Sequence, residues 1–156
     1  MNEIFFMNQA ILEAKKAASK NEVPVGAVIV KNNEVLASGH NQVIGLSDPT
    51  AHAEIITIRK ASKKINNYRL LDCHLYVTLE PCLMCLGTII NARISCVTFA
   101  LFDPKSGVIN SNTNVFTNNR LNHHTSSKVG PFGEESAKLL KDFFLLRREL
   151  KKTNLK

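Results

Sequence analysis

The sequence predicts a single α/β domain, in which helices cover a sheet that contains parallel neighbouring strands. The chain has 156 residues, enough for one well-packed core and hardly enough for two, so we expect one domain over residues 1–156. Hydrophobic residues make up 44% and charged residues 21%, which is ordinary for a globular protein. Strand and helix patterns alternate along the middle of the chain, as they do in layered α/β folds.

The first forty residues predict a helix followed by a β-hairpin. Residues 2–20 are amphipathic with a helical period. The residues expected on the apolar face are Ile4, Met7, Ile11, Ala14 and Ala18. Two β-rich runs, 23–31 and 34–41, flank the turn-forming pair Asn32-Asn33, which indicates a hairpin.

Two helices and two strands are expected next. Pro49 and Thr50 open a helix that reaches about Lys64. Its expected inward-facing residues are Ile55, Ile58 and Ala61. A strand at 73–79 leads directly into a helix that starts at Pro81 and ends near residue 91, and a further strand covers 94–101.

The last third of the chain is less regular. Residues 103–130 are rich in Ser, Thr and Asn and predict loops, with a short, poorly patterned fifth strand near 122–129. A C-terminal helix follows. The residues of its expected buried stripe are Leu139, Phe143, Leu146 and Leu150.

Composition excludes some classes of protein. No apolar run approaches the roughly 18–20 residues that span a bilayer, and "IFFM" near the N-terminus is too short and too polar in its flanks for a secretory signal. We therefore expect a soluble cytoplasmic protein without a membrane partner. In that compartment the cysteines at 73, 82, 85 and 96 are thiols or metal ligands and not disulfides.

The charge distribution leaves two interpretations open. The formal net charge is +7, and seven basic residues stand against two acidic ones between Lys138 and Lys156. Such a tail is commonly a solvated helix face, and the alternative is a surface that contacts phosphates.

Two short motifs carry the chemistry, and each stands at a predicted helix start. Cys82 and Cys85 in "EPCLMC" are three residues apart and share one face of a first helical turn, where unpaired N–H groups favour a thiolate. Alone, this pair fits a redox site or half of a structural zinc site. His52 in "DPTAHAEI" opens the preceding helix, and the two helix starts can lie side by side in such a sheet.

The number of ligands favours catalysis. One imidazole and two thiolates leave the fourth position of a tetrahedral zinc ion open, as catalytic sites do. Glu54 lies two residues after His52, close enough to exchange a proton with water at that position. His-x-Glu with Pro-Cys-x-x-Cys is the signature of zinc-dependent nucleobase deaminases. Cys73 and Cys96 lie inside predicted strands, and we interpret both as buried core thiols.

The chain resembles the bacterial tRNA-specific adenosine deaminases over nearly its whole length. The segments that carry the resemblance are "EVPVGAVIV", "DPTAHAEI", "NYRLLD", "LYVTLEPCLMC", "DPKSG", "NHH" and "FFLLRR". The resemblance implies a cytidine-deaminase-like three-layer fold, with a five-stranded mixed sheet flanked by helices. It also implies a homodimer with one zinc ion per subunit, and formation of inosine at the anticodon wobble position.

Site residues follow from the resemblance by position. His52, Cys82 and Cys85 would bind zinc, and Glu54 would be the catalytic proton shuttle while zinc-bound hydroxide attacks the adenine. The residues expected to bind the substrate are Asn41, Ala53, Glu80, Asp103, His123, Phe144, Arg147 and Arg148. The implied partner is a tRNA anticodon stem-loop, with an arginine tRNA carrying an ACG anticodon as the expected substrate.

The sequence departs from the family pattern at Phe102 and His124, where basic or small residues are usual. Two alternative functions remain open. A deaminase of free guanine or cytosine would share the zinc motifs but has less need of a basic terminal helix. A non-catalytic zinc module that only binds nucleic acid would have no use for Glu54 or for an open ligand position.

Overall fold

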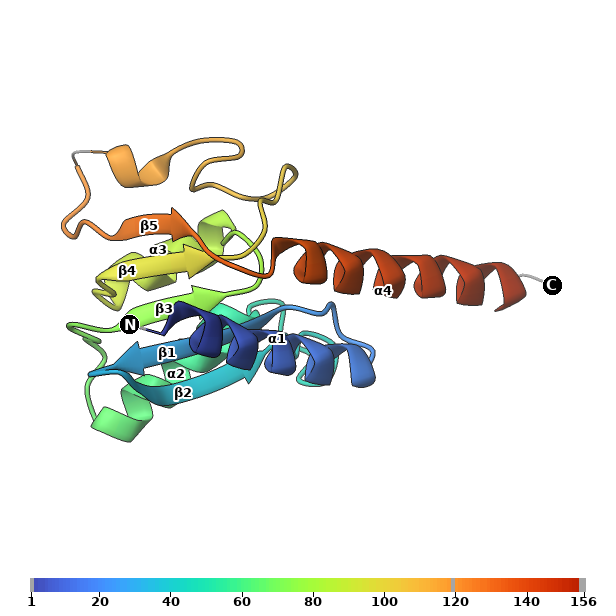
Figure 1. Ribbon diagram of the computed structural model, residues 1–156, viewed down its shortest axis with the longest axis horizontal. Coiled ribbons are helices and arrows are strands. Elements are labelled where there is room, and N and C mark those ends of the chain that lie inside the picture. Colours follow the sequence, from blue (N-terminus) through green and yellow to red (C-terminus); the bar gives the residue numbers. More distant parts are fainter. Residues whose placement is uncertain (1, 119, 155–156) are drawn as a thin grey trace.

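The computed structural model describes residues 2–118 and 120–154 and forms a sheet with helices on both faces (Figure 1). In chain order the elements are α1 Glu3–Ser19, β1 Gly26–Lys31, β2 Glu34–His40, α2 Ala53–Ile65, β3 His74–Val77, α3 Leu83–Asn91, β4 Cys96–Phe99, the 3₁₀ turn η1 Val115–Thr117, β5 Ser126–Val129 and α4 Gly133–Asn154. No helix within the described part of the chain has the length and apolar character needed to cross a membrane.

The sheet is mixed and has the order β2-β1-β3-β4-β5. Strand β1 pairs antiparallel with β2 and β3, whereas β3, β4 and β5 run parallel to one another. The expected hairpin, parallel neighbours and fifth strand are therefore confirmed. Because β3 and β4 are parallel, the segments that follow both strands leave the sheet at the same edge.

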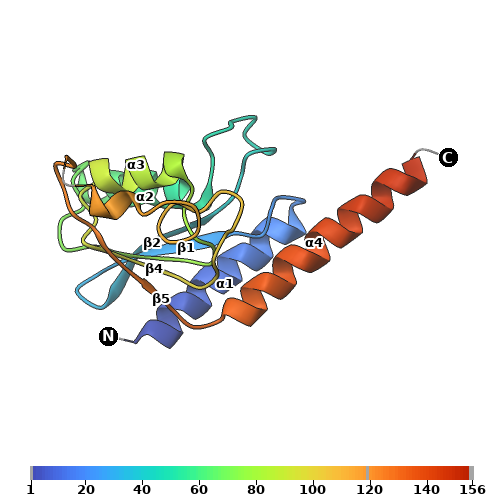
Figure 2. The same cartoon turned by 90° about the horizontal axis from the view of Figure 1, so that it is seen from above.

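The helices form two layers. Figure 2 shows α2 and α3 on one face of the sheet and α1 with α4 on the other. The larger core lies between the sheet and the α2–α3 layer, where Leu75, Val97 and Leu86 are fully buried. A smaller core beneath α1 contains Met7 and Tyr76.

Several expected details were wrong. Helix α2 begins at Ala53 and not at Thr50, because residues 47–50 form turns, in which Thr50 donates two hydrogen bonds to Asp48. Its inward face of Ile55, Ile58 and Ala61 is confirmed.

Burial predictions failed near the chain ends and at the start of β4. Ile4 is 66% exposed because it precedes the part of α1 that lies on the sheet. Leu146 and Leu150 are more than half exposed, because the second half of α4 projects beyond the domain (Figures 1 and 2). Cys73 is buried as expected, whereas Cys96 at the start of β4 is only half-buried.

Candidate metal and substrate site

The three predicted metal ligands lie together at the edge of the sheet where β3 ends. His52 is the N-cap of α2, Cys82 is the N-cap of α3, and Cys85 lies in the first turn of α3. The Nδ1 atom of His52 is 3.7 Å from the Sγ of Cys82 and 3.4 Å from the Sγ of Cys85. All three ligand atoms lie within 4.8 Å of one another.

These separations fit a tetrahedral zinc ion. With usual Zn–S and Zn–N bond lengths and tetrahedral angles, a nitrogen and a sulfur ligand lie about 3.6 Å apart. The two observed separations of 3.4 and 3.7 Å bracket that value. Neither His52 nor Cys82 uses its side chain to cap its helix, so both side chains are available as ligands.

Contacts among the three groups shift their pKa values. The hydrogen bond from Cys85 is the main cause that lowers the pKa of Cys82 to about 4, and the same contact raises the pKa of Cys85. The hydrogen bond with Cys82 raises the pKa of His52. A thiolate is thus already favoured at Cys82, and thiolates are the form of cysteine that binds metals.

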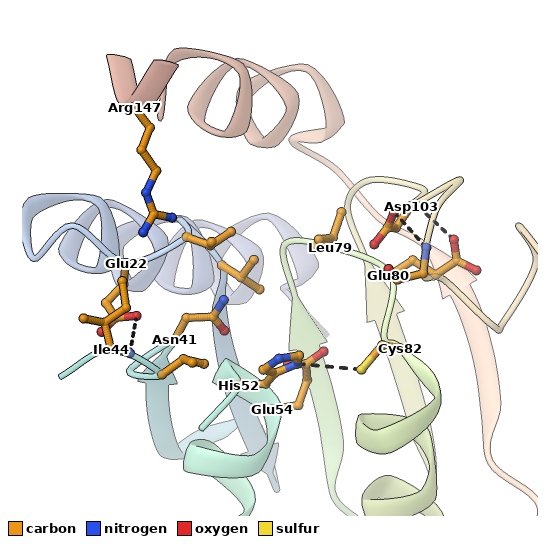
Figure 3. Close-up of a pocket in the computed structure, with 14 residues that line it drawn as sticks. Glu22, Asn41, Ile44, His52, Glu54, Leu79, Glu80, Cys82, Asp103 and Arg147 are labelled. Carbon is orange, nitrogen blue, oxygen red and sulfur yellow. Dashed lines mark hydrogen bonds between the residues drawn. The ribbon is translucent and has the colours of Figure 1, made fainter. Parts of the chain in front are cut away.

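Glu54 projects from the first turn of α2 toward the ligands (Figure 3). Its side chain is buried, at 4% exposure, and burial raises its pKa above the ordinary value for a glutamate. A carboxylate with a raised pKa is suited to accept and return protons near neutral pH.

A pocket of about 420 Å³ opens over this cluster. Its lining includes His52, Glu54 and Cys82 at the base and Asn41 on one wall (Figure 3). The Oδ1 atom of Asn41 accepts a hydrogen bond of 2.7 Å from the Ala53 N–H. That bond fixes the amide and leaves its NH₂ group as the donor for a ligand.

The opposite wall is built on Glu80, whose buried carboxylate accepts hydrogen bonds from the loop that follows β4. Burial by itself raises the pKa of Glu80, but the N–H of Asn110 and the hydroxyl of Ser111 outweigh it and hold the pKa below its usual value. Asp103 and Ser106 from the same loop line the pocket.

Helix α4 closes one side of the site. Arg147 reaches into the pocket from α4, as Figure 3 shows. Phe144, Arg147 and Arg148 line a second hollow together with Lys105 and Lys151. The guanidinium of Arg147 lies 5.3 Å from the centre of the Phe143 ring.

His123 lies apart from the other predicted substrate-binding residues. Its Nε2 is 2.8 Å from the carbonyl oxygen of Ile94, which precedes β4. The pocket lies beyond the opposite ends of the parallel strands, so His123 of the same chain does not line it. A role for His123 in binding stays a prediction.

Comparison with known proteins agrees with this geometry. The family model of MafB19-like deaminases matches residues 1–148. A tRNA-specific adenosine deaminase of Aquifex aeolicus (strain VF5) is 44% identical over 144 residues, which cover 92% of this chain and 95% of that protein. The Haemophilus influenzae protein of the same name is 46% identical over 94% of this chain and 85% of its own. The chain belongs to the tRNA-specific adenosine deaminase family.

Solved structures place this member of the tRNA-specific adenosine deaminase family among related folds. A structure from studies of A-to-I editing by tRNA:A34 deaminases superposes with a TM-score of 0.85 at 40% identity, over 88% of this chain and 99% of that one. A guanine deaminase of Bacillus subtilis superposes with a TM-score of 0.62 at 44% identity, over 65% of this chain and 66% of that one. The expected five-stranded mixed sheet flanked by helices is thereby confirmed.

Sequence reasoning missed several residues that line the pocket of this tRNA-specific adenosine deaminase family member. Glu22 is buried, and its carboxylate accepts hydrogen bonds from the N–H groups of Ile44 (3.2 Å) and Gly45 (2.7 Å). It thereby holds the loop between β2 and α2 against the pocket. A charged residue directly before an apolar strand was the only signal, and it does not distinguish a buried anchor from a solvated side chain.

Proposed function

We propose that this chain deaminates adenosine to inosine at the wobble position of a tRNA anticodon. The observation that carries the proposal is Glu54, which is buried and lines the same pocket as His52 and Cys82, two members of a three-residue ligand set that fits zinc. The relatives named tRNA-specific adenosine deaminase support tRNA as the substrate, and the likeness to a structure from studies of tRNA:A34 deaminases supports the wobble position as the site.

His52, Cys82 and Cys85 hold one zinc ion per chain in this proposal. Zinc in such a site lowers the pKa of water to about 7 and so supplies a nucleophile at neutral pH. The pocket lies on the side of the cluster where Glu54 lies, so a substrate in the pocket would lie beside both the ligand cluster and Glu54.

Glu54 moves the protons. Its carboxylate accepts a proton from the attacking water and delivers it to the adenine ring nitrogen beside carbon 6. The water oxygen bonds to carbon 6, and Glu54 takes the second proton from the hydroxyl so formed and passes it to the exocyclic amine. The bond from carbon 6 to that nitrogen then breaks. Ammonia leaves, the water oxygen remains as the carbonyl of inosine, and the NH₂ group of Asn41 orients the nucleotide.

RNA binding rests on the hollow between α4 and the loop that carries Asp103. Lys105, Arg148 and Lys151 can neutralise phosphates there, and Phe144 offers a ring on which a base can stack. An anticodon loop suits this surface because its bases are already partly single-stranded, so less energy is needed to turn one outward. The proposed substrate is the arginine tRNA with an ACG anticodon.

We further propose that the enzyme is a cytoplasmic homodimer. Leu83 at the start of α3 is 63% exposed beside the metal ligands, and a second subunit would cover apolar surface of this kind. Sedimentation should then give twice the chain mass of 17.3 kDa.

A synthetic anticodon stem-loop tests the function. The purified enzyme should convert the adenine at the wobble position, leave any other adenine of the loop unchanged, and leave free guanine unchanged. Guanine turnover without RNA turnover would favour the free-base alternative, which the likeness to a guanine deaminase keeps open. RNA binding without any turnover would support a non-catalytic module.

A further inference from the structure

The buried carboxylate of Glu80 connects the metal-binding segment to the loop after β4. Glu80 is 2% exposed and stands two residues before the ligand Cys82. It accepts hydrogen bonds from the loop N–H groups of Asp103 (3.0 Å), Ile109 (3.0 Å), Asn110 (2.7 Å) and Ser111 (3.0 Å), and from the Ser111 hydroxyl. One side chain thus organises both ends of the loop.

The two carboxylate oxygens have different partners. Oε1 accepts the three consecutive N–H groups of residues 109–111. Oε2 accepts the N–H of Asp103 and the hydroxyl of Ser111. Among the side-chain bonds of Glu80, the Oε2 bond to Asp103 is the one that holds the end of the loop that lines the pocket. A substitution that changes Oε2 alone can therefore release that end and keep the other.

The loop lies in close contact with Glu80 at Gly107. A Cβ atom at Gly107 would overlap the Glu80 carboxylate and would lie 2.7 Å from the carbonyl oxygen of Asp103. The N–H of Val108 donates to the carbonyl of Pro81 at 3.2 Å, next to the ligand Cys82. Glycine at 107 therefore permits the close approach that the carboxylate needs.

Asp103 connects the bond with Glu80 to the residues that line the pocket. Its Oδ1 accepts from the N–H groups of Lys105 (3.0 Å) and Ser106 (3.2 Å), so the residues that follow it form a tight turn. Asp103 and Ser106 both line the pocket. Asp103 lies across it from Asn41 (Figure 3). The position of the Asp103 backbone therefore determines where this wall stands.

We propose that Glu80 is a positioning residue for substrate recognition, which acts by fixing Asp103 and Ser106 in the pocket wall through its Oε2 bond to the Asp103 N–H. The proposal rests on the RNA substrate proposed above. It assigns Glu80 no contact with the reacting atoms, so its loss should affect binding of the nucleotide and spare the chemical step.

The variant Glu80→Gln should release the Asp103 end of the loop and keep the end at residues 109–111 in place. The glutamine Oε1 can keep the three N–H groups of residues 109–111, and its NH₂ group can donate to the Ser111 hydroxyl. The same NH₂ group, however, faces the N–H of Asp103, and two donors cannot form a hydrogen bond. With the anticodon stem-loop as substrate, KM should rise about tenfold or more, whereas kcat should stay within about threefold. Zinc content should be unchanged.

Two control variants also alter the hydrogen bonds of a buried carboxylate and should lower thermal stability. Ser111→Ala removes one hydrogen bond from the same carboxylate and keeps the Asp103 bond. Glu13→Gln alters another buried carboxylate, which is 2.8 Å from His40 and lies outside the pocket lining. Both should lower thermal stability and leave KM unchanged. If either raises KM as much as Glu80→Gln does, the effect is general destabilisation and the proposal is overturned.

Amide hydrogen exchange tests the same bond without any substrate. In Glu80→Gln the amide of Asp103 should lose protection, whereas those of Ile109, Asn110 and Ser111 should keep it. Equal protection at Asp103 in wild type and variant would overturn the proposal. An inactive wild-type enzyme would instead contradict the RNA substrate, so the two failures are distinguishable. Gly107→Ala should reproduce the rise in KM, because it pushes the loop off an intact Glu80.

Discussion

The Nδ1 atom of His52 lies 3.4 Å from the Sγ of Cys85, although 33 residues separate them in the chain. Helices α2 and α3 pack on the same face of the sheet and begin at the same edge, which brings their first turns together (Figure 2). Two helix N-termini, with their unpaired N–H groups and positive dipole ends, therefore surround the thiolate ligands. The candidate metal site follows from the order of the elements.

Replacing either thiolate ligand should remove the metal. Cys82→Ser or Cys85→Ser should purify with little zinc and with lower thermal stability, because ligand binding contributes to folding free energy. Cys73→Ser is the matched control, since Cys73 is a fully buried cysteine away from the cluster. Metal analysis of the purified variants decides the matter. Zinc loss in the Cys73 variant alone would show that the ligands are wrongly assigned.

Removal of the proton shuttle should abolish turnover and spare the metal. We expect Glu54→Ala and the isosteric Glu54→Gln to fold and to retain zinc, and to lose about a hundredfold to ten-thousandfold or more in kcat. The loss should be large because one carboxylate serves more than one proton transfer. Single-turnover assays on the anticodon stem-loop would measure it. A variant that kept a tenth of wild-type activity would rule out this role.

The two arginines of α4 should control RNA affinity and leave the chemistry largely intact. Replacing Arg147 and Arg148 with alanine removes roughly two phosphate contacts, which should flatten the plot of log affinity against log salt by about 1.4. Metal content should not change, and the rate at saturating tRNA should fall much less than the affinity.

A control of equal charge isolates this effect. Lys63→Ala with Arg69→Ala removes two exposed positive charges from residues outside both hollows. That double variant should keep the wild-type salt slope. Should the α4 double variant show the same slope and affinity as wild type, its arginines would only solubilise an exposed helix end.

Stability should depend on pH through His74. This side chain is buried, is hydrogen-bonded to Thr98 at 2.7 Å and stacks on Tyr76. Burial lowers the pKa of His74 from 6.5 to about 4. Between these values the unfolded chain binds a proton that the folded chain does not, so stability falls as the pH falls through this window. The loss is on the order of 2 kcal/mol after allowance for solvent screening.

The variant His74→Gln tests this dependence. It has no titratable group, and its amide can still pair with Thr98. Denaturant unfolding of the variant between pH 6.5 and 4 should show a shallower decline than wild type. Release of zinc at low pH affects both proteins alike and cancels in the difference. Parallel curves for the two proteins would refute the assignment.

Short-range patterns predicted much of the fold. The β-rich apolar runs on either side of Asn32-Asn33 predicted the hairpin, and the motif spacing predicted that His52, Cys82 and Cys85 come together, as they do in the structure. The exposed half of α4 was predicted wrongly because its periodicity shows an amphipathic helix but not whether a partner covers the apolar side. Buried carboxylates were the least predictable feature. The burial of Glu22 and Glu80 depends on backbone N–H groups of distant loops, which no local pattern records.

Sequencing of bulk tRNA after incubation with the purified enzyme tests the proposed activity most directly, because inosine is read as G. We predict A-to-G changes confined to the first anticodon nucleotide, in the arginine tRNA with an ACG anticodon, and their absence with the Glu54→Ala variant. Changes spread over other positions, or none in any tRNA with the zinc-loaded enzyme, would contradict the proposed function.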